Sequence, residues 1–320
     1  MPRKILITDS LFVFDEHVAQ MKAAGFDPTR LDKVKATEAE LVEAISGCEG
    51  YILGGVEQVT EPVIRAGAGH LKVISFTGAD YGAFIPVADF ATQNGIAITN
   101  CPGANASAVA EFALTYILML ARRIPQLTMQ GGKDFYIADE FSAMTVGVLG
   151  YGFIGQKVAS MLKTLGFRVI VSSRSNSPRI AQDGLKPVTI DELVTQSDVL
   201  TIHVDKKSGA GLITASQVNK MKSGAGLVNT CDDSVIDSAA LLARLARGEI
   251  FFAGDHVDLK APAGCPAGQF IKTNASIAFN TRQANKLASD WATQSVINLM
   301  TGKDDPYIVN PEYKKYAKAA

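Results

Sequence analysis

A glycine turn between a strand-like and a helix-like segment constrains the fold of this chain more than any other feature. TVGVL at 145–149 is apolar and rich in β-branched residues, which predicts a buried strand. GYGFIG follows at 150–155, and apolar residues at helical spacing then predict a helix over 156–165. FRVIVSS at 167–173 predicts the next strand. GxGxxG in this context predicts a βαβ unit that binds a dinucleotide.

Each glycine of the turn has its own expected role. Gly150 permits the tight turn, Gly152 lets backbone N–H groups approach a pyrophosphate, and Gly155 allows the helix to pack closely on the strand. Phe153 and Ile154 belong to the first turn of the helix, whose N-terminus supplies partial positive charge. We therefore expect these five residues to hold the cofactor phosphates. The alternative is a tight turn that binds nothing.

Strand-like runs alternate with helical stretches along the whole chain. Further strands are expected at 4–8, 49–55, 71–76, 96–99, 198–204, 225–230, 250–257 and 276–280. Such alternation predicts parallel sheets with helices on both faces. The six strands from residue 145 onward complete a doubly wound α/β Rossmann sheet, so we expect a dinucleotide-binding domain over 102–283. Residues 1–101 and 284–320 are expected to form a smaller, flavodoxin-like α/β substrate domain that is split in sequence.

The end of the second Rossmann strand predicts which cofactor is used. NAD-binding proteins place a carboxylate there to bind the ribose 2′-OH. This chain has Ser172, Ser173, Arg174 and Ser175, without an acid. Arg174 can stack on adenine and pair with a 2′-phosphate, while the hydroxyls donate and accept around it. We therefore expect NADPH as the cofactor, with NADH as an alternative; Arg174 could instead be a solvated surface charge.

Composition argues against several classes of binding partner. The 320 residues carry a formal net charge of −1 and no basic block, so no nucleic-acid partner is expected. The longest strongly apolar stretch, 112–121, is short of the ~20 residues of a membrane span, so no membrane partner is expected. Four scattered cysteines lack metal-ligand spacing. We expect a cytoplasmic protein without a metal site.

Several segments together resemble the D-isomer-specific 2-hydroxyacid dehydrogenases. They are TNCPGANASAVAEFAL at 99–114, VGVLGYGFIG at 146–155, SDVLTIHV at 197–204, MKSGAGLVNT at 221–230 and GEIFFAGDHV at 248–257. The resemblance implies hydride transfer to or from a small-molecule substrate in a cleft between the domains, and a homodimer built mainly through the cofactor domain. It also implies a structural or cofactor-edge role for His203, and Thr230 joins the expected cofactor contacts.

The chain departs from the family's catalytic pattern. Asp232 stands where the family has the Arg that clamps a carboxylate, Ala261 where it has the Glu that orients the catalytic His, and Asn280 where it has that His. His256 matches the Asp that contacts the nicotinamide amide. Asp80 enters the glycine-rich loop that binds substrate. Together these departures imply replaced chemistry or none.

The replacements favour an imine over a ketone. Asn280 cannot supply the proton that ketone reduction needs. Asp232 would repel a substrate carboxylate by roughly 4 kcal/mol at ~4 Å and an effective dielectric near 20. A protonated imine needs no further proton during hydride transfer, and a nearby carboxylate stabilises its charge.

We therefore predict an NADPH-dependent imine reductase that acts on a cationic imino acid. Asp232, with Asp233 and Asp80, would form the acidic pocket; His256 would shuttle a proton and Asn280 would orient the substrate. The chain thereby resembles imine reductases of antibiotic biosynthesis that act on a dehydroarginine-derived imine.

Two other functions stay open at this point. The first is a 2-hydroxyacid dehydrogenase, or 2-keto acid reductase, whose substrate carboxylate is held by Arg122, Arg282 or loop backbone. The second is a non-catalytic NADP(H)-binding protein. Asp232 and Asp233 could also be a solvated turn, and the remaining histidines, His17 and His70, are expected at the surface.

Overall fold

The computed structural model describes residues 3–8, 13–33, 35–130, 136–174, 178–205, 209–255 and 257–317. The chain divides into two compact units, one of Met1–Asn105 with Thr281–Ala320 and one of Ala106–Asn280. The boundaries expected from sequence were 101/102 and 283/284.

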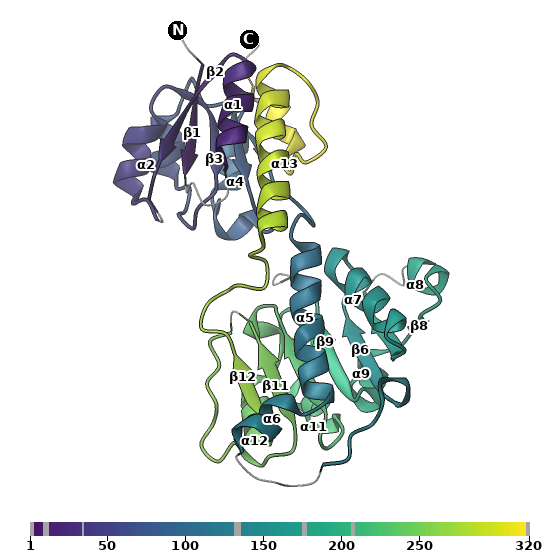
Figure 1. Ribbon diagram of the computed structural model, residues 1–320. Coiled ribbons are helices and arrows are strands. Elements are labelled where there is room, and N and C mark those ends of the chain that lie inside the picture. The colour runs from purple at the N-terminus through teal and green to yellow at the C-terminus, as the bar shows by residue number, and fades with distance from the viewer. Residues whose placement is uncertain are drawn as a thin grey trace. The chain divides into compact units, whose positions relative to one another are not determined.

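The first unit is built on a five-stranded parallel sheet in the order β2-β1-β3-β4-β5 (Figure 1). Its strands are β1 (Arg3–Thr8), β2 (Phe26–Leu31), β3 (Cys48–Leu53), β4 (Val73–Phe76) and β5 (Ala97–Thr99). Its helices are α1 (Asp15–Ala23), α2 (Glu38–Ile45), α3 (Glu61–Ala66), α4 (Ala88–Gln93) and α13 (Arg282–Met300), with 3-10 turns η1 (Tyr81–Ala83) and η4 (Pro311–Lys315). This strand order is flavodoxin-like, so we call this part the flavodoxin-like unit.

Alternating residues of the strands fill a core on each face of this sheet. Leu6 of β1 packs with residues of α2, α3 and α4, whereas Ile5 and Ile7 pack with residues of α1 and α13. Strand β2 was not expected, because its sequence FDPTRL mixes polar residues with Pro28. Pro28 is tolerated because β2 lies at the edge of the sheet.

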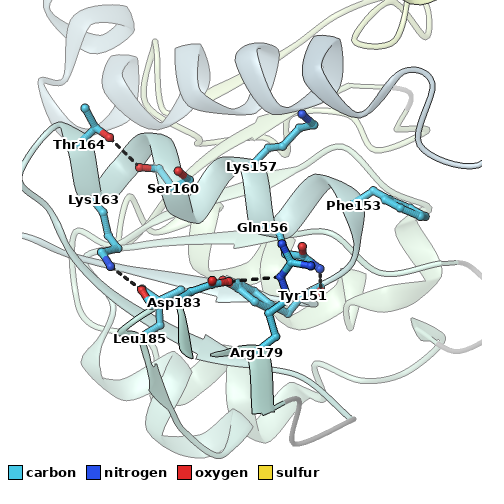
Figure 2. A pocket seen from close by; sticks show the side chains of 10 residues that line it. All are labelled: Tyr151, Phe153, Gln156, Lys157, Ser160, Lys163, Thr164, Arg179, Asp183 and Leu185. Atoms are coloured by element: carbon cyan, nitrogen blue, oxygen red, sulfur yellow. Dashed lines mark hydrogen bonds and ion pairs between the residues drawn. The ribbon is translucent and has the colours of Figure 1, made fainter. Parts of the chain in front are cut away.

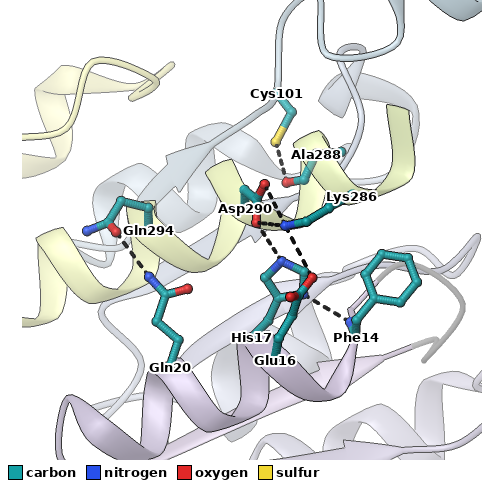
Figure 3. A network of polar contacts seen from close by, with 9 residues as sticks. All are labelled: Phe14, Glu16, His17, Gln20, Cys101, Lys286, Ala288, Asp290 and Gln294. Carbon is teal, nitrogen blue, oxygen red and sulfur yellow. Dashed lines mark hydrogen bonds and ion pairs between the residues drawn. The ribbon is translucent and has the colours of Figure 1, made fainter. Parts of the chain in front are cut away.

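His17 corrects a sequence expectation in this unit. It is 1% exposed, not a surface residue. Its Nδ1 accepts the backbone N–H of Phe14 (3.1 Å), so Nε2 donates to Asp290 Oδ1 (2.8 Å). Figure 3 shows how this contact, and Lys286 between Glu16 and Asp290, join α1 to α13. The imidazole therefore serves helix packing.

The second unit is built on a seven-stranded parallel sheet in the order β12-β11-β10-β9-β6-β7-β8 (Figure 1). Its strands are β6 (Thr145–Leu149), β7 (Arg168–Ser172), β8 (Lys186–Pro187), β9 (Val199–Ile202), β10 (Gly226–Asn229), β11 (Phe251–Gly254) and β12 (Phe270–Lys272). Its helices are α5 (Ala106–Ala121), α6 (Ile124–Met129), α7 (Phe153–Thr164), α8 (Pro178–Gln182), α9 (Ile190–Gln196), α11 (Ala215–Lys220) and α12 (Ser238–Ala246), with 3-10 turns η2 (Phe141–Ala143) and η3 (Asp233–Val235).

Helices cover both faces of the larger sheet. Residues of α5 and α7 pack in one core, and residues of α9, α11 and α12 pack in the other. The strand order reverses between β6 and β9, which confirms the doubly wound Rossmann fold. We call this part the Rossmann unit.

The expected strand at 276–280 is wrong. The last strand is β12 at Phe270–Lys272, and 276–280 is irregular. The reason is that the backbone N–H groups of Ile277 and Ala278 donate to the carboxylate of Asp255, not to a neighbouring strand. Across the described ranges, none of the helices is both long and apolar enough to cross a membrane.

Candidate functional site

The three glycines of the turn meet different surroundings. Gly150 has φ +92°, and a Cβ there would lie 2.1 Å from the carbonyl oxygen of His203. A Cβ at Gly155 would lie 2.1 Å from the carbonyl oxygen of Gly150. Around a Cβ at Gly152, by contrast, the described residues place no heavy atom within 4 Å. The first and third glycines are thus required by the fold itself, whereas the second leaves room beside the N-terminus of α7.

Two cavities, one of about 490 Å³ and one of about 670 Å³, are both lined in part by residues at this turn. The larger cavity is found at the carboxyl ends of β6, β7 and β9, the edge where open α/β sheets bind ligands. Six of the residues predicted to bind the cofactor line it: Gly150, Gly152, Ser172, Ser173, Arg174 and His203.

Phe153 and Ile154, also predicted to bind the cofactor, do not line the larger cavity. Phe153 is 63% exposed and lines the smaller cavity, and Ile154 packs against the core. Ser175 lies outside the described residues. The larger cavity therefore contains the glycine turn and the end of β7, but not the first two side chains of α7.

His203 follows β9 and is 7% exposed. Burial lowers its pKa to about 3, so the imidazole is neutral at physiological pH. Its Nε2 shares a hydrogen bond with Thr201 Oγ1 (2.9 Å). Its Nδ1 is buried without a hydrogen-bond partner in the described chain. A neutral ring suits a structural or cofactor-edge role and does not suit proton donation.

The end of β10 carries further unpaired polar atoms. The Asn229 side-chain oxygen accepts the N–H of Cys231 (2.9 Å), while its Nδ2 and the Thr230 hydroxyl are buried and lack partners within the described ranges. Together with His203 Nδ1, these atoms lie at the carboxyl ends of the neighbouring strands β9 and β10. Buried polar atoms are ordinarily hydrogen-bonded, so these three are candidate contacts for a polar ligand or an ordered water.

Asp232 and Asp233 follow directly. Asp232 is half-buried and caps η3, its Oδ1 accepting the N–H of Ser234 (3.0 Å). Asp233 accepts the N–H of Asp258 (2.7 Å), and burial raises its pKa, with the charges of Asp258 and Asp232 adding to the effect. The end of β10 is thus followed by two carboxylates that both accept backbone N–H groups, and the acidic pocket expected from the sequence stays a prediction.

The other residues of the predicted catalytic site belong to separate segments of the chain. Asn280 is exposed, and its N–H donates to the Ile277 carbonyl (2.9 Å). Asp80 is exposed before η1 and belongs to the flavodoxin-like unit. His256 lies outside the described residues. Ala261 is exposed in the segment between β11 and β12.

Sequence reasoning missed Asp255. This residue follows β11 and is 2% exposed, and its carboxylate accepts hydrogen bonds from the segment that precedes Asn280. The available signal was an acid placed directly after the apolar run IFFAG. A buried charge must be hydrogen-bonded, so the position itself indicates a structural or functional partner.

The smaller cavity lies between α7 and α8 (Figure 2). Tyr151 donates from its hydroxyl to Asp183 Oδ2 (2.7 Å), and burial raises the pKa of this phenol. Arg179 lies 3.6 Å from the same carboxylate, and Lys163 donates to the Asp183 carbonyl. These contacts fasten the glycine turn to α8. In the described part of the chain, His, Cys, Asp and Glu form no group of three that could hold a metal.

Comparison with known proteins adds independent findings. The family model of the D-isomer specific 2-hydroxyacid dehydrogenase NAD binding domain matches residues 114–269. The D-3-phosphoglycerate dehydrogenase of Archaeoglobus fulgidus is 30% identical over 311 residues, 93% of this chain and 58% of the relative. The human D-3-phosphoglycerate dehydrogenase is 28% identical over 97% of this chain and 59% of its own length. The chain thus spans less than three fifths of these curated relatives.

Solved structures show the same architecture. The D-lactate dehydrogenase of Treponema pallidum superposes with a TM-score of 0.77 at 26% identity, covering 96% of this chain and 99% of that one. The NAD+-bound 3-phosphoglycerate dehydrogenase of Entamoeba histolytica superposes with a TM-score of 0.79 at 21% identity, covering 97% and 99%.

Proposed function

Because this chain belongs to the D-isomer-specific 2-hydroxyacid dehydrogenase family, we propose that it is a nicotinamide-dependent oxidoreductase acting on a small-molecule substrate. The observation that carries this proposal is the cavity of about 670 Å³ at the carboxyl ends of β6, β7 and β9. It joins the open side of Gly152, the N-terminus of α7 and the end of β7, which is the layout a dinucleotide requires.

Successive segments of the chain suit successive parts of the cofactor. Backbone N–H groups at Gly152 and in the first turn of α7 would bind the pyrophosphate. Ser172, Ser173 and Arg174 line the cavity at the end of β7, where the adenosine ribose would lie, and none is acidic. When bound, the cofactor supplies or accepts the hydride. Arg174 favours NADPH, and NADH remains the alternative because the matching family model is of an NAD binding domain.

The first substrate class is a 2-hydroxy acid with its 2-keto acid. The names of the relatives support it, since they include D-3-phosphoglycerate and D-lactate dehydrogenases. Such a substrate needs a cation or backbone N–H groups for its carboxylate. Arg122 directly follows α5, and its neighbour Arg123 donates to the carbonyl of Gly224 near the amino end of β10, which is the opposite edge of the sheet from the larger cavity. Arg282 or loop backbone would have to replace it.

The second substrate class is a cationic imine, and Asp232 specifically favours it. A carboxylate at the carboxyl end of β10 would stabilise an iminium and repel a keto acid. Hydride addition to the iminium carbon gives a neutral amine, so the nitrogen requires no proton in that step. Asn280 donates hydrogen bonds without exchanging a proton, which suffices for orienting this substrate.

The two classes are separated by the oxidation of NADPH or NADH, followed by absorbance, with panels of 2-keto acids and imines. If Asp232 stabilises an iminium, Asp232→Arg abolishes imine reduction and improves keto acid reduction, whereas the matched Asp232→Asn only weakens imine reduction. If the substrate is a keto acid, the wild type reduces keto acids and ignores imines. A protein that binds the cofactor but oxidises it with neither panel is a non-catalytic NADP(H)-binding protein, and the proposal is then wrong.

A further inference from the structure

Two segments of the Rossmann unit carry predicted catalytic residues. One leads from Asn229, the last residue of β10, to Asp232; the other follows β12 and leads from Thr273 to Asn280. Strand β11 lies between β10 and β12 in the sheet. The residue that follows β11, Asp255, is therefore placed between the two segments.

The contacts of Asp255 reach both segments. Its backbone N–H donates to the Asn229 carbonyl (3.0 Å). Its Oδ1 accepts from Thr273 Oγ1 (2.5 Å) and from the N–H of Ile277 (3.2 Å), and its Oδ2 accepts from the N–H of Ala278 (2.9 Å). A carboxylate that is 2% exposed is thus fully engaged by donors of one loop.

Asp255 is linked to Asn280 through the backbone of Ile277. The Asn280 N–H donates to the carbonyl of Ile277, the residue whose own N–H is held by Asp255. On the other side, the Tyr116 hydroxyl donates to the Gly254 carbonyl (3.2 Å) and anchors the end of β11 to α5. Residues 276–280 form no sheet ladder, and Asp255 accepts the backbone N–H groups of Ile277 and Ala278 instead.

We propose that Asp255 is a positioning residue that holds the Asn280 loop against the end of β10, so that Asn280 and Asp232 keep a fixed relation during hydride transfer. The catalytic part of this inference rests on the proposed function, whereas the loop-holding part does not. Asp255 would have this role with either candidate substrate, because a keto acid and an imine must both be oriented to accept the hydride.

The test is Asp255→Asn, which keeps the shape but turns a donor group toward the backbone N–H groups of the loop. Its control is Asp237→Asn, which alters another backbone-capping carboxylate of the same unit, bonded to the N–H of Ala240 (2.9 Å) at the start of α12. We expect hydrogen exchange of the peptide 273–280 to accelerate in Asp255→Asn only. We expect kcat to fall roughly ten- to hundredfold, as for lost charge-assisted hydrogen bonds, with the Kd for NADPH changed less than about threefold.

Thr273→Val serves if Asp255→Asn does not fold, because it removes one donor and leaves both backbone bonds; an intermediate acceleration of exchange is expected. Unchanged exchange over 273–280 would overturn the loop-holding role, and faster exchange with an unchanged kcat would overturn the catalytic part. An equal fall of kcat in Asp237→Asn would also overturn the catalytic part, because the fall would then reflect a general loss of stability. If the wild type reduces neither substrate panel, the proposed function and the catalytic part of this inference fail, and exchange alone decides the loop-holding role.

Discussion

Gly152→Ala separates the demands of the fold from those of the cofactor. Gly152 has φ −82° and ψ −160°, which alanine adopts without strain, and a Cβ there meets no described heavy atom within 4 Å. The substitution should therefore leave the protein without cofactor as stable as before, or more stable by about 0.4–1 kcal/mol through the unfolded chain. The added methyl group enters the space that a pyrophosphate would occupy.

The expected loss of affinity follows from overpacking, which costs about 1–3 kcal/mol. At 1.4 kcal/mol for each tenfold change, the Kd for NADPH should rise roughly 5- to 150-fold. Ligand at a hundred times the wild-type Kd stabilises the folded state by about 2.7 kcal/mol, and a 50-fold weaker variant retains only roughly 0.6 kcal/mol of that stabilisation.

Thermal unfolding of wild type and variant, with and without NADPH, measures both quantities. Gly155→Ala is the matched comparison, because its Cβ would lie 2.1 Å from the Gly150 carbonyl oxygen and should lower the melting temperature even without ligand. The reasoning is refuted if Gly152→Ala melts lower than wild type without NADPH, or if NADPH stabilises it as much as wild type.

Three further predictions concern single side chains. Arg174→Ala should weaken NADPH binding at least tenfold and leave NADH binding nearly unchanged, as measured by fluorescence titration; equal losses would remove the 2′-phosphate role. Burial lowers the His203 pKa from 6.5 to about 3, so the unfolded chain binds the extra proton between these values and stability falls by roughly 1.4 kcal/mol per unit as the pH drops below 6.5. His203→Gln should flatten this pH dependence in denaturant unfolding, and a profile identical to wild type would contradict the assignment. His17→Ala should destabilise the flavodoxin-like unit by roughly 2–4 kcal/mol, while His70→Ala, at an exposed position, should change stability little. Similar urea midpoints for both variants would contradict the packing role of the buried His17 imidazole.

Local patterns predicted much of the fold. Strand β6, the glycine turn and α7 follow from an apolar run, three glycines at defined spacing and a helical period, all within a short stretch of sequence. Thr37 and Glu40 form a capping box at the start of α2, which is a local signal as well. The larger cavity then lies where parallel strands end, which the strand–helix alternation already implied.

Features that depend on contacts between remote segments could not be predicted from local patterns. SIAFN at 276–280 has the composition of a strand, yet the carboxylate of Asp255, more than twenty residues earlier, takes its backbone N–H groups. His17 has the flanks of a surface residue, yet α13 brings Asp290 against it from the far end of the chain. The residues around 145–173 thus determined by themselves that the chain forms a βαβ unit with an open glycine turn, because those interactions are local. Only the tertiary structure decided which buried polar groups hold the Asn280 loop and join α1 to α13, because a hydrogen bond between remote segments exists only after the sheets have brought them together.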